Sequence, residues 1–230
     1  MRMRKEMHLL IIIVTVLMVI IRCKKDATET VTVTDIDGNI YNTVTIGTQV
    51  WMKENLKTTK YSNGDIIGTT NPSTLDITSE ATPKYQWAYD GNETNVATYG
   101  RLYTWFVVSD SRNVCPTGWH LPSDAEWTTL ITFLGGDSVA GGKLKEIGTT
   151  HWTKPNTGAT NETGFTALPG GVRQKFGTFM YTGNTGTWWN STENSAASAY
   201  YTSIGYYYIF VDRYYLDKLY GFSVRCLQNS

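Results

Sequence analysis

The sequence predicts an α+β fold, in which twisted antiparallel sheets are joined by long loops and accompanied by two helices. The 230-residue chain is rich in Thr, Tyr, Trp and Gly, and only 17% of its residues are charged. This composition favours strands and turns over long helices. Two segments have the apolar spacing of helices, and many short β-branched or aromatic runs lie between Gly, Asn and Pro. With 41% hydrophobic residues the chain can bury a core, which excludes a disordered protein.

The charge balance excludes one class of partner. Basic and acidic side chains number 20 each, so the formal net charge is zero, and no basic cluster occurs outside residues 1–5. Proteins that bind nucleic acid need many cations on one face to neutralise phosphates. We therefore expect no nucleic acid as a partner.

The N-terminus has the pattern of an export signal. Residues 2–5 contain three basic side chains, and residues 9–21 are apolar except for Thr15. A run of thirteen residues, twelve of them apolar, is too short to cross a hydrocarbon core of about 30 Å, which needs roughly 20. The basic flank and the terminal position argue against an ordinary buried helix. We therefore predict a signal peptide over residues 1–22.

A cysteine directly after the apolar run predicts a lipid anchor. Residues 20–23 resemble a bacterial lipobox, in which Cys23 becomes the lipidated first residue of the mature chain. Arg22 departs from that pattern, which has a small residue before the cysteine. Residues 24–30 are mostly polar and are typical of a tether. We therefore expect lipidation at Cys23, a tether over residues 23–30, and attachment to a membrane at the outer membrane or cell surface.

The two other cysteines, Cys115 and Cys226, are expected to form a disulfide, because an exported protein meets an oxidising compartment. The alternative is that one of them is a catalytic thiolate. That role needs a neighbouring His and acid, and the sequence near either cysteine offers no such arrangement.

A hairpin and a third strand are predicted at the start of the domain. Val, Thr and Ile are frequent in residues 31–34 and 40–46, and an Asp-Gly pair at 37–38 lies between these runs. A third run covers residues 49–53. Residues 57–83, rich in Thr, Ser, Asn, Gly and Pro, are predicted to form a surface loop.

Two acidic stretches invite a calcium interpretation. Asp35 and Asp37 lack the further ligands of an EF-hand loop, so a turn explains them better. Residues 90–95 are also rich in oxygen ligands, and a solvated loop is favoured there. We expect no metal ion and no other cofactor.

Two helices are predicted in the middle of the chain. The first covers residues 123–134, where Ser123 and Glu126 form a capping box and Gly135 ends the helix. A shorter helix is predicted over residues 140–147. The apolar stripes consist of Trp127, Leu130, Ile131 and Leu134 in the first helix and Ala140, Leu144 and Ile147 in the second.

The C-terminal part is predicted to consist of strands and turns. Residues 153–187 are rich in Gly, Thr and Asn, with hairpin signals at 156–158 and 183–186. The last sixty residues are strongly aromatic, and residues 222–226 alternate strictly. No internal repeat and no second domain are apparent, so residues 31–230 are expected to form one domain.

Few residues point to catalysis. Neither His120 nor His151 has a second His at the helical spacing of a zinc site. Residues 136–143 are similar to a phosphate-binding loop, but the glycine spacing is wrong and Leu144 replaces the Ser or Thr that would hold magnesium. Paired carboxylates for glycoside hydrolysis stay open, because they need only proximity in space.

Six blocks of this sequence occur in a recognisable order. They are 35–40 with 49–59 (QVWMKENLKTT), 99–105 (YGRLYTW), 115–127 (CPTGWHLPSDAEW), 142–171, 188–193 (WWNSTE) and 221–226 (GFSVRC). Together they resemble the Fibrobacter succinogenes major paralogous domain, and the resemblance covers about residues 31–228. That family occurs in exported, often lipid-anchored proteins of Bacteroidetes and related bacteria. The resemblance implies a C-type-lectin-like fold, with paired chain ends, two helices beside twisted sheets, and a long loop region that presents ligands.

The resemblance implies little about activity. Formylglycine-generating enzymes share the broad fold and a block similar to residues 121–127, but their chemistry needs reactive cysteines. Calcium-dependent lectins of the fold carry a carboxylate after Trp-Asn, and here Ser191 follows Trp189 and Asn190. Calcium-mediated sugar binding is therefore not supported.

The sequence and the resemblance together predict a non-enzymatic surface lipoprotein that binds a glycan or a surface protein. The alternatives are an envelope-associated enzyme, either carbohydrate-active or of a degenerate formylglycine type, and a purely structural envelope component. In the resembling fold the ligand surface corresponds to residues 148–220, and the candidates there are Trp188, Trp189, Asn190 and Glu193. Adjacent side chains of a strand point to opposite faces, so one Trp should be core and the other available, with Trp189 as the buried one. The loop 90–95 is the next candidate.

Overall fold

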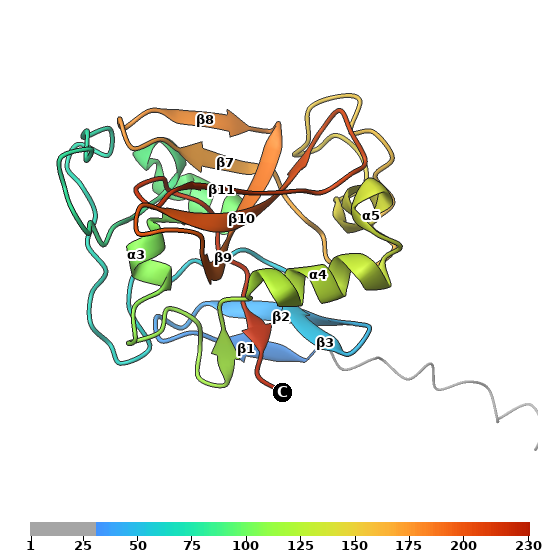
Figure 1. Ribbon diagram of the computed structural model, residues 1–230, viewed down its shortest axis with the longest axis horizontal. Coiled ribbons are helices and arrows are strands. Elements are labelled where there is room, and N and C mark those ends of the chain that lie inside the picture. The colour runs from blue at the N-terminus through green and yellow to red at the C-terminus, as the bar shows by residue number, and fades with distance from the viewer. Residues whose placement is uncertain (1–30) are drawn as a thin grey trace, which may run out of the picture. The chain divides into compact units, whose positions relative to one another are not determined.

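The computed structural model describes residues 31–230, so the predicted signal peptide, Cys23 and the tether lie outside the described residues. The described part mixes helices and sheets, and all its paired strands run antiparallel (Figure 1). The strands are β1 Thr32–Thr34, β2 Ile40–Ile46, β3 Gln49–Met52, β4 Gln86–Trp87, β5 Leu102–Tyr103, β6 Trp119–His120, β7 Gly170–Arg173, β8 Phe179–Thr182, β9 Thr185–Glu193, β10 Ser198–Gly205, β11 Asp212–Asp217 and β12 Leu227–Gln228. The helices are α2 Val96–Tyr99, α3 Trp105–Val108, α4 Asp124–Phe133 and α5 Asp137–Leu144, with short 3₁₀ turns η1 Tyr89–Gly91 and η2 Glu93–Asn95. Within residues 31–230, no helix has the length and apolarity needed to cross a membrane.

The predicted opening hairpin and third strand are confirmed. Strands β1 and β2 pair across the Asp37-Gly38 turn, where Gly38 adopts a φ of +85°. Asp35 shapes this turn, because its Oδ1 accepts hydrogen bonds from the backbone N–H of Asp37 at 3.0 Å and of Asn39 at 2.9 Å. The Asp35 side chain therefore serves turn geometry, as the sequence indicated. The Asp37 carboxylate instead accepts hydrogen bonds from Thr58 and Thr59 and forms an ion pair with Lys60.

The first strands and the last one share a single sheet, whose order is β1-β2-β3-β12-β6. Leu227 of β12 lies opposite Trp51 of β3 on one side and His120 of β6 on the other. Figure 1 shows this sheet at the bottom of the domain, with α4 lying above it. The first and the last strand of the described chain therefore belong to the same sheet.

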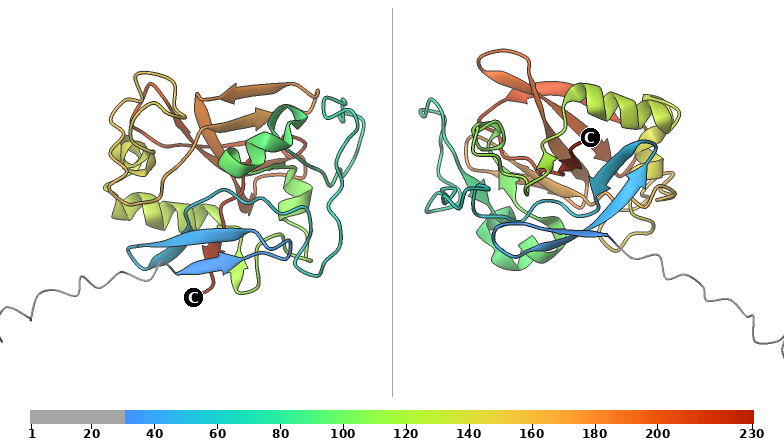
Figure 2. Two further views of the ribbon diagram at one scale, coloured as in Figure 1. Left: turned by 180° about the vertical axis from the view of Figure 1, so that it is seen from behind. Right: turned by 90° about the horizontal axis from the view of Figure 1, so that it is seen from below.

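A second layer contains the aromatic C-terminal strands. Strands β9, β10 and β11 form a three-stranded sheet in the order β11-β10-β9, and the β7–β8 hairpin lies next to it. Figure 2 shows the hairpin at the end of the domain opposite β1 when the molecule is seen from behind. The turn at residues 183–184 joins β8 to β9, but these strands pair with β7 and β10 and not with each other. The predicted hairpin at 183–186 is therefore a connection between two sheets.

The helix over 123–134 is confirmed, and the second helix is shifted. The Ser123 hydroxyl accepts from the Glu126 N–H, and the Glu126 carboxylate accepts from the Ser123 N–H, so the predicted capping box is complete. The second helix, α5, covers Asp137–Leu144 instead of 140–147. Ile147 lies beyond it and is 63% exposed, because the chain turns inward at Lys145.

Two loop predictions need correction. The segment 57–83 is not only surface, since it sends several apolar side chains into the interior, among them Tyr61, Ile67 and Ile77. Residues 156–158 do not form a hairpin, since no strand flanks them. Asn156 instead holds a left-handed turn with a φ of +49°, and its Nδ2 donates to the backbone oxygen atoms of Glu146 and Gly148.

The core has two clusters, one on each side of β9. The first contains Trp189, Phe222 and the disulfide. The second contains Trp188, Trp127 and Phe165, whose ring centroids lie 6.0–6.3 Å apart. The two clusters therefore bury both faces of β9.

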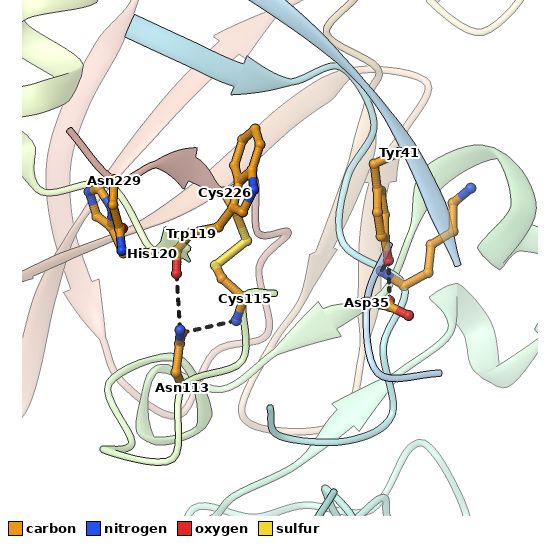
Figure 3. Close-up of a disulfide and its surroundings, with 9 residues drawn as sticks. Asp35, Tyr41, Asn113, Cys115, Trp119, His120, Cys226 and Asn229 are labelled. Atoms are coloured by element: carbon orange, nitrogen blue, oxygen red, sulfur yellow. Dashed lines mark hydrogen bonds between the residues drawn. A yellow bond between two sulfur atoms is a disulfide. The ribbon is translucent and has the colours of Figure 1, made fainter. Parts of the chain in front are cut away.

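The expected disulfide between Cys115 and Cys226 is present (Figure 3). It links residues 111 positions apart, with the two Cα atoms 6.0 Å from each other. Asn113 fixes the loop on one side, because its Oδ1 accepts from the Cys115 N–H and its Nδ2 donates to the Trp119 carbonyl. The disulfide therefore ties the segment before β6 to the segment before β12.

Candidate functional site

Both tryptophans of the predicted ligand surface are buried. Their side chains point to opposite faces of β9, as the alternation predicts, but each face is covered by one core cluster. Trp188 donates to Asn55 Oδ1 and Trp189 donates to the Tyr103 carbonyl, each at 2.8 Å. The prediction that Trp189 is core is confirmed. The prediction that the other Trp is available to a ligand is wrong, because a strand in the middle of this fold has no free face.

The other two predicted residues do not form a joint surface. Asn190 is fully buried, and its Nδ2 donates to Asp124 Oδ1 at 3.2 Å. Glu193 is exposed, and its Oε1 accepts from Lys218 Nζ at 2.5 Å. The first is therefore a core residue and the second is half of an ion pair.

Polar side chains of the loop 90–95 are also engaged in contacts within the protein. Glu93 forms a two-point ion pair with the buried Arg101, at 3.0 and 2.5 Å. Asn92 accepts from the Thr94 backbone N–H and hydroxyl. Within the described residues, no group of three or more His, Cys, Asp or Glu side chains is placed to hold a metal ion.

The structure instead presents a groove between the β7–β8 hairpin and the β9–β11 sheet, which we name the tyrosine groove. Its volume is about 310 Å³. It is lined by Val172, Gln174, Tyr181, Thr185, Thr187, Tyr201, Ser203, Leu216, Tyr220 and Phe222. These residues come from strands that pair in two different sheets, together with the segment between β11 and β12.

The groove has an apolar floor and polar walls. Phe222 and Val172 are buried, and the rings of Tyr201 and Tyr220 pack on Phe222 with centroids 5.3 and 6.1 Å away. On the wall formed by β9 and β10, the hydroxyl oxygens of Thr187 and Ser203 lie 3.4 Å apart. A ligand in this groove would meet ring faces and hydroxyl groups together.

Several polar groups of the groove are free to bind. Within residues 31–230, no hydrogen-bond partner occurs for the hydroxyls of Tyr181, Tyr201, Tyr220 and Thr185 or for the side-chain amide of Gln174. Hydroxyls and amides both donate and accept. The groove therefore offers donors and acceptors whose capacity is not used by the fold.

The backbone holds Tyr181 in an unusual conformation at the rim. Its φ is +69°, a region that bulky residues rarely adopt, and its side chain is 49% exposed. Gly171 on the paired strand also has a φ of +69°, and a Cβ there would lie 2.6 Å from the Met180 carbonyl oxygen. Strained backbone of this kind is concentrated at functional sites.

The groove is electrically neutral. Its ten lining residues include no Asp, Glu, His, Lys, Arg or Cys. Burial raises the pKa of the Tyr201 phenol, and the nearby Asp212 and Tyr214 raise it further, so this hydroxyl stays protonated. The lining therefore offers hydroxyl, amide and apolar groups to a ligand.

Candidate catalytic groups elsewhere are engaged in structural contacts. His151 Nδ1 lies 2.8 Å from Glu146 Oε2, and the Tyr99 ring packs edge-on against His151 at 6.0 Å. His120 contacts Glu126 and Asn229 at 2.8 and 2.7 Å. Cys115 and Cys226 are bonded to each other, so neither is a free thiolate nucleophile.

A family model described as the Fibrobacter succinogenes major domain matches residues 44–228. The chain belongs to this family. Neither a search of curated proteins nor a search of solved structures finds a match.

The blocks that carry the resemblance to the Fibrobacter succinogenes major domain meet in the core at Asn55. Asn55 Oδ1 accepts from Trp188 Nε1 at 2.8 Å and from Arg225 at 2.9 Å. Its Nδ2 donates to the Tyr99 carbonyl at 2.9 Å. Four of the six blocks thus contribute to one hydrogen-bond network.

The tyrosine groove lies outside that pattern. All of its lining residues except Phe222 fall between the resembling blocks. The aromatic composition of the last sixty residues pointed toward Tyr201 and Tyr220. Nothing in the sequence placed Gln174 and Tyr181 beside them, because only the packing of the hairpin on the sheet brings these segments together.

Proposed function

We propose that this domain binds an uncharged carbohydrate in the tyrosine groove. The observation that carries the proposal is a neutral groove that combines tyrosine rings with unpaired hydroxyl and amide groups. The C–H faces of sugar rings pack on aromatic rings, and sugar hydroxyls exchange hydrogen bonds with groups of this kind. A volume of about 310 Å³ is at the lower end for ligand sites, which suits one or two sugar rings.

We further propose that the protein is exported and lipid-anchored through Cys23 at the outer membrane or cell surface. The N-terminal sequence pattern and the disulfide support this location.

The fold is proposed to be a variant of the C-type-lectin-like fold. Two features support this: β12 enters the sheet of the N-terminal hairpin, and the disulfide ties the segments beside it. The groove would then be a ligand site that needs no calcium, since its lining has no carboxylate.

The test is binding of the purified protein to an array of neutral and acidic glycans, followed by calorimetry on the neutral glycan that binds best. Tyr181→Ala and Gln174→Ala should each weaken binding about tenfold, because each removes a contact worth roughly 1 to 1.5 kcal/mol. Phe133→Ala is the matched control, since this ring is 63% exposed on α4, away from the groove.

Three results would contradict the proposal. They are binding only to acidic glycans, binding that the two groove variants leave unchanged, and release of cleaved sugar from the bound glycan. The last result would favour the carbohydrate-active enzyme instead, and its acids would have to lie outside the groove.

A further inference from the structure

The sheet that forms one wall of the tyrosine groove continues beyond it. In the register of β10 and β11, Tyr201 lies opposite Tyr214. Directly opposite residues of paired strands share a face of the sheet. Tyr201 lines the groove, and so does Leu216, which is two residues beyond Tyr214 on the same face. Tyr214 therefore stands beside the groove on the same side of the sheet.

Tyr214 forms an exposed aromatic surface with its neighbour, which we name the tyrosine platform. The rings of Tyr214 and Tyr215 are stacked, with centroids 4.6 Å apart and planes 12° from parallel. The two residues are 58% and 40% exposed. The ring of Tyr200 supports Tyr215 edge-on at 6.0 Å. Large aromatic side chains left in water and braced by other rings are typical of binding surfaces.

We propose that the tyrosine platform is a second sugar subsite that extends the tyrosine groove, so that the ligand is a neutral oligosaccharide. This inference rests on the proposed function of the groove. The platform supplies flat ring faces and the groove supplies free hydroxyls and amides, which are the two contacts that a chain of uncharged sugars needs. Tyr214 lies opposite Tyr201 of the groove in the register of β10 and β11, so one chain can contact both.

An extended peptide is the other occupant to consider, because β11 is an edge strand of its sheet. β11 begins and ends with Asp212 and Asp217 and contains Arg213. Charged residues on an edge strand oppose the addition of another strand. The edge of β11 is therefore protected, whereas the ring faces of the platform stay accessible.

The test measures how the affinity for oligosaccharides of different length changes in variants of the groove and of the platform. The probes are neutral oligosaccharides of one to six β-1,4-linked units, in glucose, mannose, xylose and N-acetylglucosamine series, titrated calorimetrically into the purified protein. Affinity should rise with length up to three or four units. Tyr214→Ala should weaken the tetrasaccharide about tenfold and leave the monosaccharide unchanged, whereas Tyr181→Ala should weaken both.

Two controls accompany these variants. Tyr207→Ala removes a ring that is 64% exposed on the β10–β11 connection and lines no part of the groove, so it should change no affinity. Tyr214→Phe keeps the ring face and should retain binding. Thermal unfolding of every variant checks that lost binding does not come from lost structure.

The outcomes separate the two proposals. If no neutral glycan of any length binds, both are wrong. If the sugars bind equally at all lengths, or if Tyr214→Ala weakens the monosaccharide as much as the tetrasaccharide, the groove proposal stands and the extension is wrong. A library of extended peptides is tested in parallel. If Tyr214→Ala weakens the binding of peptides and leaves the binding of sugars unchanged, the platform is a peptide site and the extension is wrong.

Discussion

Single residues hold this core together through buried polar groups. Asn55 receives hydrogen bonds from a Trp indole and from the guanidinium of Arg225, and it donates to the Tyr99 carbonyl and to the Ser223 hydroxyl. Arg225 is 1% exposed and carries its charge among the rings of Phe165 and Trp188. Burial lowers the pKa of the Arg225 guanidinium to about 9. Burying such a cation costs free energy unless its N–H groups are hydrogen-bonded, so the loss of any acceptor should destabilise the fold.

Asn55→Ala should lower the free energy of unfolding by about 3 kcal/mol, because it leaves a buried guanidinium N–H and a buried indole N–H unpaired. The measurement is urea unfolding followed by tryptophan fluorescence. Asn63→Ala is the control, since Asn63 is exposed and bonds only to nearby Asp65. Equal effects of the two substitutions would show that the Asn55 network adds no stability.

Lys145 is a second buried cation, and its contacts are all neutral. Its Nζ donates to the carbonyl oxygens of Thr157, Gly205 and Tyr208 at 2.8, 3.0 and 2.8 Å. Burial lowers the pKa of the Lys145 ammonium from 10.5 to about 8. Through these hydrogen bonds Lys145 connects residues 205–208 with the end of α5.

The stability that Lys145 contributes should therefore depend on pH. Between pH 8 and about 10.5 the unfolded chain holds the Lys145 proton more strongly than the folded one, so the cost of burying the charge falls as the pH rises. The difference in unfolding free energy between the natural protein and Lys145→Met should shift in favour of the natural protein across that window. Urea unfolding of both proteins at intervals of pH measures it. A difference that stays constant would contradict the lowered pKa.

At the scale of elements, short sequence motifs correctly predicted those helices and turns that depend on interactions between residues close in the chain. The opening hairpin and α4 formed where the sequence indicated, because an Asp-Gly turn and a capping box act over a few residues. The start of α5 was missed, because Gly135 and Gly136 both take a positive φ and the helix begins directly after them. The burial of Trp188 was missed because it depends on the packing of α4 against β9 and β10.

The capping box of α4 offers an element-level prediction. Ser123→Ala should destabilise the domain by about 1 kcal/mol, because the N–H of Glu126 loses its side-chain acceptor. Thr129→Ala on the exposed side of the same helix should change the stability by less than about 0.5 kcal/mol. Thermal unfolding of the two variants compares them. If both are neutral, the helix start is fixed by tertiary packing alone.

The groove is an element-level feature that the sequence could not locate. Gln174 and Tyr181 belong to the β7–β8 hairpin, whereas Tyr201 and Leu216 belong to the neighbouring sheet. Sequence periodicity reports which face of a strand is apolar. It does not report which hairpin covers which sheet, and the site exists only where the two meet.

For the whole molecule, the disulfide should contribute much of the stability. Closing a loop between residues 111 positions apart reduces the entropy of the unfolded chain by an amount worth up to about 4 to 5 kcal/mol. Guanidinium unfolding with and without a reductant measures the loss. The double variant Cys115→Ala, Cys226→Ala should be less stable and insensitive to the reductant. An unchanged midpoint after verified reduction would contradict this expectation.

The proposed anchor can be tested on the same scale. Cys23→Ser should release the protein from the membrane fraction, since it removes the site of acylation and stable anchoring needs more than one acyl chain. Cell fractionation and labelling with a radioactive fatty acid measure this. Lys24→Ser, next to the cysteine, serves as the control and should stay bound, because it leaves the acylated residue in place. If Cys23→Ser remains in the membrane through an uncleaved leader, the lipoprotein proposal is wrong.

The position of β12 between β3 and β6 has a consequence for biosynthesis. Synthesis proceeds from the N-terminus, so β3 and β6 both exist before β12, and each has an unpaired edge until it arrives. Contacts such as that between Asn55 and Arg225 span 170 residues, and folding that depends on such distant pairs is slow. A nascent chain therefore stays open until residues 227–228 have been made. Such a delay would suit the proposed export, because a narrow translocation channel admits only an unfolded polypeptide.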